Sequence, residues 1–130
     1  MCSKNYNVCI FFVLILCAIV TGNGCSSSLD SEKITMVIVT ATNCQSCETT
    51  DDGIEYITHN FPDIQIKTVE IHTAEGAMYV STYRLWRVPV YLFLDTKGRE
   101  LYRLEGQQNR NTLNEAITIA KQRLGKYNIL

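Results

Sequence analysis

The 130-residue chain has only two prolines, a single tryptophan and no large excess of either charge. Its 12 Lys and Arg residues balance 13 Asp and Glu residues, which argues against a general nucleic-acid binder with its usual basic excess. The chain also lacks a glycine-rich phosphate loop, a Ser/His/Asp constellation and paired carboxylates at a plausible site. At this length, with 46% hydrophobic residues, we expect one globular domain, which excludes a multidomain enzyme.

The six cysteines divide the chain into two parts. Four lie in the first 25 residues, and only Cys44 and Cys47 lie in the remainder. A pair so close in sequence closes too short a loop to act as a long-range structural cross-link. In an exported chain, such a pair is more typical of redox chemistry.

Residues 8–20 form an uncharged run of thirteen residues after a polar start that carries only Lys4. A membrane-spanning helix needs roughly 20 apolar residues, so the run fits the core of a secretory signal better than a membrane span. The alternative is a short uncleaved anchor. We expect a signal peptide over residues 1–24.

The end of this segment, Gly24-Cys25, resembles the lipobox of bacterial lipoproteins, although Gly22 replaces the aliphatic residue that is usual there. The resemblance implies that Cys25 is lipidated and becomes the new N-terminus. Residues 25–32 would then form a serine-rich tether, and residues 33–130 the folded domain. The expected location is outside the cytoplasm, on a bacterial membrane, facing the periplasm or the cell exterior.

Hydrophobic periodicity in the rest of the chain predicts the order β-α-β-α-β-β-α, a mixed sheet covered by helices. The expected helices are about 46–60, 74–83 and one through Leu113 to Leu124, with Asn111 or Thr112 as N-cap and Gly125 as the stop. The expected strands are 34–40, 64–71, 90–94 and 100–104.

Cys44-Gln45-Ser46-Cys47 follows a buried strand and is expected to begin a helix. The free N–H groups and the dipole of a first helical turn stabilise a thiolate, so Cys44 is the candidate nucleophile. Cys47, one turn inside, is the candidate resolving thiol. Acidic residues soon after the motif oppose thiolate formation and favour a reductase over an oxidant; they are Glu48, Asp51 and Asp52.

Three features resemble the thioredoxin-like family over residues 33–124. They are the Cys-x-x-Cys after the first long strand, a Val88-Pro89 pair 42 residues beyond Cys47, and the last two strands with Gly106 after them. The resemblance implies a three-layer α/β fold and a cis peptide at Val88–Pro89 facing Cys44. It also implies a substrate groove, formed by Trp86, Arg87, Val88, Pro89 and Gly106.

Two positions depart from the family pattern. Asn43 replaces the tryptophan usual before the first cysteine, and Ile38 replaces a buried acid that assists proton transfer. These departures argue against a general cytosolic-type thioredoxin, but the dithiol remains.

The sequence therefore predicts an exported, membrane-tethered thiol–disulfide oxidoreductase that acts on client proteins with thiols or disulfides. It needs no cofactor beyond its own Cys44–Cys47 couple, and as a reductase it would need a membrane redox partner that recycles the dithiol. We expect a monomer with no resident metal. Two alternatives stay open: a copper- or zinc-binding module using the two cysteines, and a non-catalytic thioredoxin-like adaptor.

Overall fold

The computed structural model describes residues 33–47, 50–127 and 129. The expected signal peptide, Cys25 and the tether lie outside these residues. Within the described ranges the predicted order of elements is confirmed, with a short 3-10 turn added. The elements are β1 (Ile34–Thr40), η2 (Gln45–Cys47), α2 (Thr50–Asn60), β2 (Ile64–Glu70), α3 (Ala74–Tyr83), β3 (Val90–Leu94), β4 (Glu100–Glu105) and α4 (Arg110–Tyr127).

The four strands form one mixed sheet in the order β2-β1-β3-β4. β1 runs parallel to β2 and antiparallel to β3, and β4 returns antiparallel beside β3. β1 and β3 occupy the centre, and their continuous apolar runs are buried on both faces, as central strands require.

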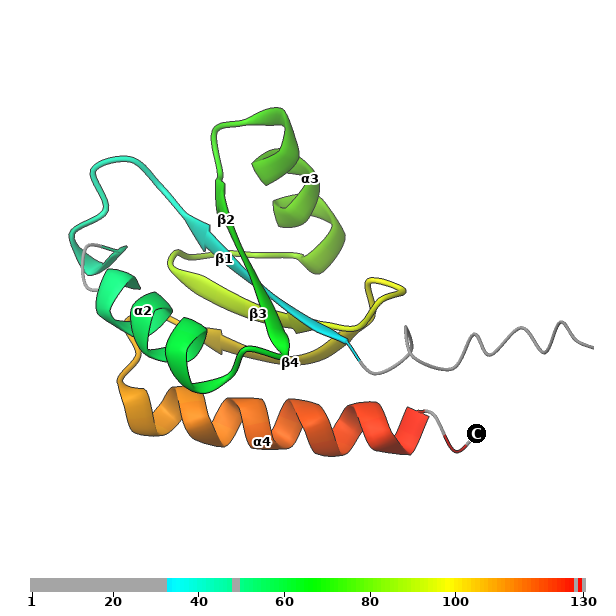
Figure 1. Ribbon diagram of the computed structural model, residues 1–130. Coiled ribbons are helices and arrows are strands. Elements are labelled where there is room, and N and C mark those ends of the chain that lie inside the picture. Colours follow the sequence, from blue (N-terminus) through cyan, green and yellow to red (C-terminus); the bar gives the residue numbers. More distant parts are fainter. Residues whose placement is uncertain (1–32, 48–49, 128, 130) are drawn as a thin grey trace, which may run out of the picture.

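Helices cover both faces of the sheet, α2 and α4 on one side and α3 on the other (Figure 1). Alternate residues of β1 divide between two cores because successive strand side chains point to opposite faces. Met36 and Ile38 pack in the core beneath α2 and α4, whereas Val37 and Val39 pack beneath α3. The predicted three-layer thioredoxin-like arrangement is confirmed.

The helix boundaries correct three expectations. The cysteine motif lies in and before a 3-10 turn, and the α-helix expected from about residue 46 is described only from Thr50. The N-cap of α4 is Asn109, whose side-chain oxygen accepts hydrogen bonds from the N–H groups of Asn111 (2.9 Å) and Thr112 (3.0 Å). Gly125 does not end this helix, which continues to Tyr127.

One edge of the sheet brings three connections together. The Ile71 N–H donates to the Thr40 carbonyl at 2.9 Å, and Val90 pairs with Val39 in the adjacent strand. The cysteine loop after β1, the connection after β2 and the loop before β3 therefore meet at the same end of the sheet. The opposite end holds the start of β1, where Thr35 pairs with Leu94.

Candidate redox site

Cys44 and Cys47 form a disulfide, with their Cα atoms 5.2 Å apart. The Cys47 N–H donates to the Cys44 carbonyl at 2.9 Å and closes the short turn that holds both residues. Both cysteines are partly buried, so the disulfide is neither a core cross-link nor fully exposed. The Ser46 hydroxyl lies 3.3 Å from Cys44 Sγ.

The loop that leads into the disulfide is fastened to the next strand connection by Glu70, at the end of β2. One carboxylate oxygen accepts from the Thr42 N–H at 3.3 Å, and the other accepts from the His72 N–H at 2.9 Å. Between Thr42 and Cys44, Asn43 adopts a left-handed backbone with φ 61°, which asparagine tolerates better than most residues.

The loop before β3 carries most of the residues expected to bind substrate. The Val88–Pro89 peptide is cis, as the family resemblance implies, and Pro89 is buried. Its carbonyl accepts a 2.7 Å hydrogen bond from the N–H of Gly106, which has φ +80°. This bond places Gly106 directly beside Pro89, so two of the expected groove residues are in contact.

Trp86 is 88% exposed, an extreme value for a side chain of this size. With Arg87, Val88 and Leu85 it lines an open hollow of about 220 Å³, whose other walls are Ile71 and Val80. Since Ile71 bonds to Thr40, this hollow lies at the sheet edge from which the cysteine loop departs. An exposed aromatic ring beside an apolar hollow is a surface suited to an extended peptide.

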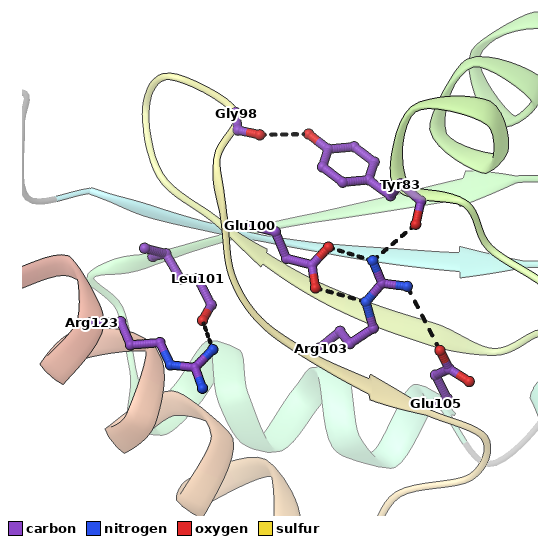
Figure 2. Close-up of polar contacts among 7 residues, drawn as sticks. All are labelled: Tyr83, Gly98, Glu100, Leu101, Arg103, Glu105 and Arg123. Carbon is purple, nitrogen blue, oxygen red and sulfur yellow. Dashed lines mark hydrogen bonds and ion pairs between the residues drawn. The ribbon is translucent and has the colours of Figure 1, made fainter. Parts of the chain in front are cut away.

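Arg103 on β4 braces the loop between α3 and β3 from outside (Figure 2). Its guanidinium donates to both carboxylate oxygens of Glu100 and, at 2.9 Å, to the carbonyl of Tyr83 at the end of α3. It also lies 3.7 Å from Glu105, which is in turn 3.5 Å from Arg87. A series of ion pairs on β4 thus reaches Arg87 in the expected groove, and a hydrogen bond from Arg103 joins it to the end of α3.

Ile38, at the position of the family's buried acid, is fully buried in β1. Its strand neighbours are Thr68 and Tyr91. An apolar side chain therefore occupies this position in the core of the sheet.

Three residues of the site were not singled out from the sequence: Ser46, Glu70 and Arg103. Ser46 could have been identified from the sequence, because it is a hydrogen-bonding residue between the two cysteines. Glu70 and Arg103 act through contacts with distant segments and carry no local signal.

The two histidines of the chain, His59 and His72, are exposed. Within the described ranges, no three His, Cys, Asp or Glu residues are grouped to hold a metal ion.

The sequence matches no protein-family model and no curated protein. Solved thioredoxins match it in structure. The thioredoxin of Fasciola hepatica is 24% identical with a TM-score of 0.58, covering 67% of this chain and 80% of its own. That of Trypanosoma brucei brucei is 22% identical with a TM-score of 0.57, covering 68% and 75%. Thioredoxin O2 of Arabidopsis thaliana, in its oxidised state, is 18% identical with a TM-score of 0.58, covering 68% and 76%.

At these identities the likeness establishes the fold. The chain has the thioredoxin-like fold and carries a Cys-x-x-Cys disulfide at the edge of its sheet. None of the helices that can be described is long and apolar enough to cross a membrane.

Proposed function

We propose that this protein is a thiol–disulfide oxidoreductase that acts on protein disulfides. The observation that carries the proposal is the Cys44–Cys47 disulfide, held in a partly exposed turn at the sheet edge that also bears the Pro89 loop. A disulfide that closes so short a loop adds little stability, whereas its exposure makes it accessible to exchange.

The reductive reaction proceeds in two balanced exchanges. The Cys44 thiolate attacks one sulfur of a client disulfide, the client S–S bond breaks, and the released client thiolate takes up a proton. Cys47 loses its proton and attacks Cys44 Sγ, the Cys44–client S–S bond breaks, and the Cys44–Cys47 disulfide forms. The second client sulfur leaves as a thiolate and takes up a proton. Two electrons and two protons pass to the client, and an external dithiol must return them.

The client segment binds, in this proposal, beside the disulfide along Trp86, Arg87, Val88, Pro89 and Gly106. The hollow next to Trp86 suits an apolar client side chain, and the exposed Arg87 lies at its rim. The groove residues thus supply contact area, and the two cysteines supply the chemistry.

A redox titration of the full-length protein in detergent tests this function. No Lys or Arg lies between Lys33 and Lys67, so trypsin releases Cys44 and Cys47 together in one peptide free of the other four cysteines. We expect a single reversible two-electron transition, with both thiols alkylated together. If no disulfide forms, or if the thiols react only after a chelator is added, the proposal is wrong and a metal-binding role replaces it.

We further propose that the protein is exported, tethered by a lipid on Cys25, and acts as a reductase recycled by a membrane dithiol partner. The uncharged run before Gly24-Cys25 and the acidic residues after the motif support this. A Cys25→Ala variant should move from the membrane to the soluble fraction. Continued membrane association would indicate an uncleaved anchor, and a midpoint potential above that of the compartment would indicate an oxidant.

A further inference from the structure

Among the residues that the structure describes, Ser46 has its hydroxyl within hydrogen-bond distance of the disulfide, and chemistry fixes the direction of this bond. The Ser46 Oγ lies 3.3 Å from Cys44 Sγ. A disulfide sulfur carries no hydrogen, so the hydroxyl is the donor and the sulfur the acceptor. The Cys47 N–H to Cys44 carbonyl bond closes the turn around Ser46, which keeps the hydroxyl beside Cys44.

We propose that Ser46 is a catalytic residue whose hydroxyl stabilises the Cys44 thiolate when the disulfide is reduced. A hydrogen bond to an ionised acceptor is roughly twice as strong as one to a neutral acceptor. The same contact therefore stabilises the reduced, ionised form more than the disulfide. Because the donor belongs to the same three-residue turn, it can follow the sulfur by rotation about its own side-chain bond.

This role rests on the proposed exchange reaction and adds a determinant of its direction. Acidic residues after the motif disfavour the thiolate, whereas Ser46 favours it and so makes the couple more oxidising than those acids alone would. The cysteines lie in and before the 3-10 turn and not in the first turn of α2, whose free N–H groups would stabilise a thiolate. The Ser46 hydroxyl replaces part of that stabilisation.

The test measures the rate of Cys44 alkylation against pH in the reduced full-length protein, with fragmentation of the 34–67 peptide to assign the site. Ser46→Ala should move the midpoint of the profile upward by about 0.5–1 pH unit, a roughly threefold to tenfold slower reaction below the midpoint. Above the midpoint, equilibrium with glutathione should shift by a similar factor toward the protein disulfide.

Two variants provide the comparison. Ser46→Thr keeps the hydroxyl and should retain the profile of the unchanged protein, and Gln45→Ala removes an exposed side chain of the same turn and should also retain it. The role is overturned if Ser46→Ala leaves the profile unchanged, or if either comparison variant shifts it as far. The alkylation profile is measured with a chelator present and needs no client and no reversible couple, so failure of the proposed function would not affect this result.

Discussion

Asp95 follows β3 with its side chain only 2% exposed, and its carboxylate accepts three hydrogen bonds. The donors are the N–H groups of Lys97 and Arg99, each at 2.8 Å, and the Arg99 guanidinium at 2.6 Å. Burial acts to raise the pKa of Asp95, but the bonds from the Arg99 backbone, the Arg99 side chain and the Lys97 backbone together hold this pKa below its usual value.

Asp95→Ala should lower the free energy of unfolding at pH 7 by about 2 kcal/mol, because it removes three partly buried hydrogen bonds to a charged acceptor and leaves their donors without it. A folded-state pKa below the unfolded one stabilises the protein above the ordinary value of 3.8, and this stabilisation is lost as the pH falls through the folded-state pKa. The difference in unfolding free energy between the unchanged protein and Asp95→Ala should therefore shrink at acid pH. Urea unfolding at neutral and acid pH measures both effects.

The matched control is Asp63→Ala. Asp63 pairs with Lys121 at 2.6 Å, the same distance as the Asp95–Arg99 pair, but its side chain is 59% exposed. An exposed pair contributes about 0–1 kcal/mol, so this variant should change stability little. Equal losses in the two variants would contradict the importance of burial.

Trp86 is the residue at which client affinity can be separated from stability. Trp86→Ala should raise the KM for a protein disulfide about tenfold, because the variant lacks the aromatic contact with the bound client. The free energy of unfolding should stay nearly unchanged, because Trp86 is 88% exposed. Steady-state reduction of a disulfide-bonded client measures this. Met78→Ala removes another exposed apolar side chain, 57% exposed on α3 and outside the hollow, and should leave the KM unchanged.

At the scale of elements, Gly76 determines how closely α3 packs on the sheet. A Cβ at this position would lie 2.0 Å from the Glu70 carbonyl oxygen and 2.6 Å from the Ile71 Cα, so Gly76→Ala must displace backbone. We expect a loss of about 3 kcal/mol in unfolding free energy. Gly125→Ala, in the open last turns of α4, should instead gain roughly 0.5–1 kcal/mol. Equal effects in chemical denaturation would contradict this packing.

Arg103 supplies the second element-scale prediction. Arg103→Met removes the donors to Glu100 and to the Tyr83 carbonyl, and we expect a loss of about 1–2 kcal/mol. The released end of α3 should speed hydrogen exchange at Leu85, whose N–H bonds to the Val80 carbonyl at 3.0 Å.

Arg123→Met is the control for Arg103. Arg123 on α4 donates to the Leu101 carbonyl of β4 at 2.7 Å (Figure 2). Its guanidinium also lies over the Tyr102 ring, 5.3 Å from the ring centre. Its loss should leave exchange at Leu85 unchanged. Faster exchange at Leu85 in both variants would indicate a general loosening rather than a specific brace.

The sequence predicted the elements whose patterns are local. β1 and β3 are continuous apolar runs, and the bounds of α3 agree with the expected 74–83. The cis Val88–Pro89 bond was expected only through the family resemblance. The bonds of Glu70 to Thr42 and of Arg103 to Tyr83 were not predicted, because they depend on which distant segments meet. The 3-10 turn at the cysteines was not predicted either, although the bond that closes it is local.

Helix ends show the same limit on a smaller scale. Asn109, Asn111 and Thr112 are all good capping residues, and the cap falls on Asn109 because its carboxamide oxygen bonds two free N–H groups. Gly125 is a common stop signal, yet α4 continues because Tyr127 packs under Arg99, 4.5 Å from its guanidinium. The start of α4 is thus defined by local hydrogen bonds, whereas its last turn has a tertiary contact that the sequence pattern does not show.

For the molecule as a whole, reduction of the disulfide should leave the fold intact. The Cys44–Cys47 loop is so short that loop-closure entropy accounts for about 2 kcal/mol at most. Denaturation with and without a dithiol reductant should show a cooperative transition in both cases, shifted by no more than this amount. The double variant Cys44→Ser/Cys47→Ser should match the reduced protein and ignore the reductant. Unfolding on reduction would instead assign the disulfide a structural role.

The start of β1 and the end of α4 lie at the end of the molecule opposite the disulfide. Leu94 beside Thr35 and Arg99 beside Tyr127 bring these ends together, while the cysteines follow the other end of a strand roughly 20 Å long. A reporter enzyme fused after the end of α4, or a resin coupled there, would leave the disulfide uncovered. The same layout favours an affinity column that displays a Cys47→Ser variant to capture its clients from an extract.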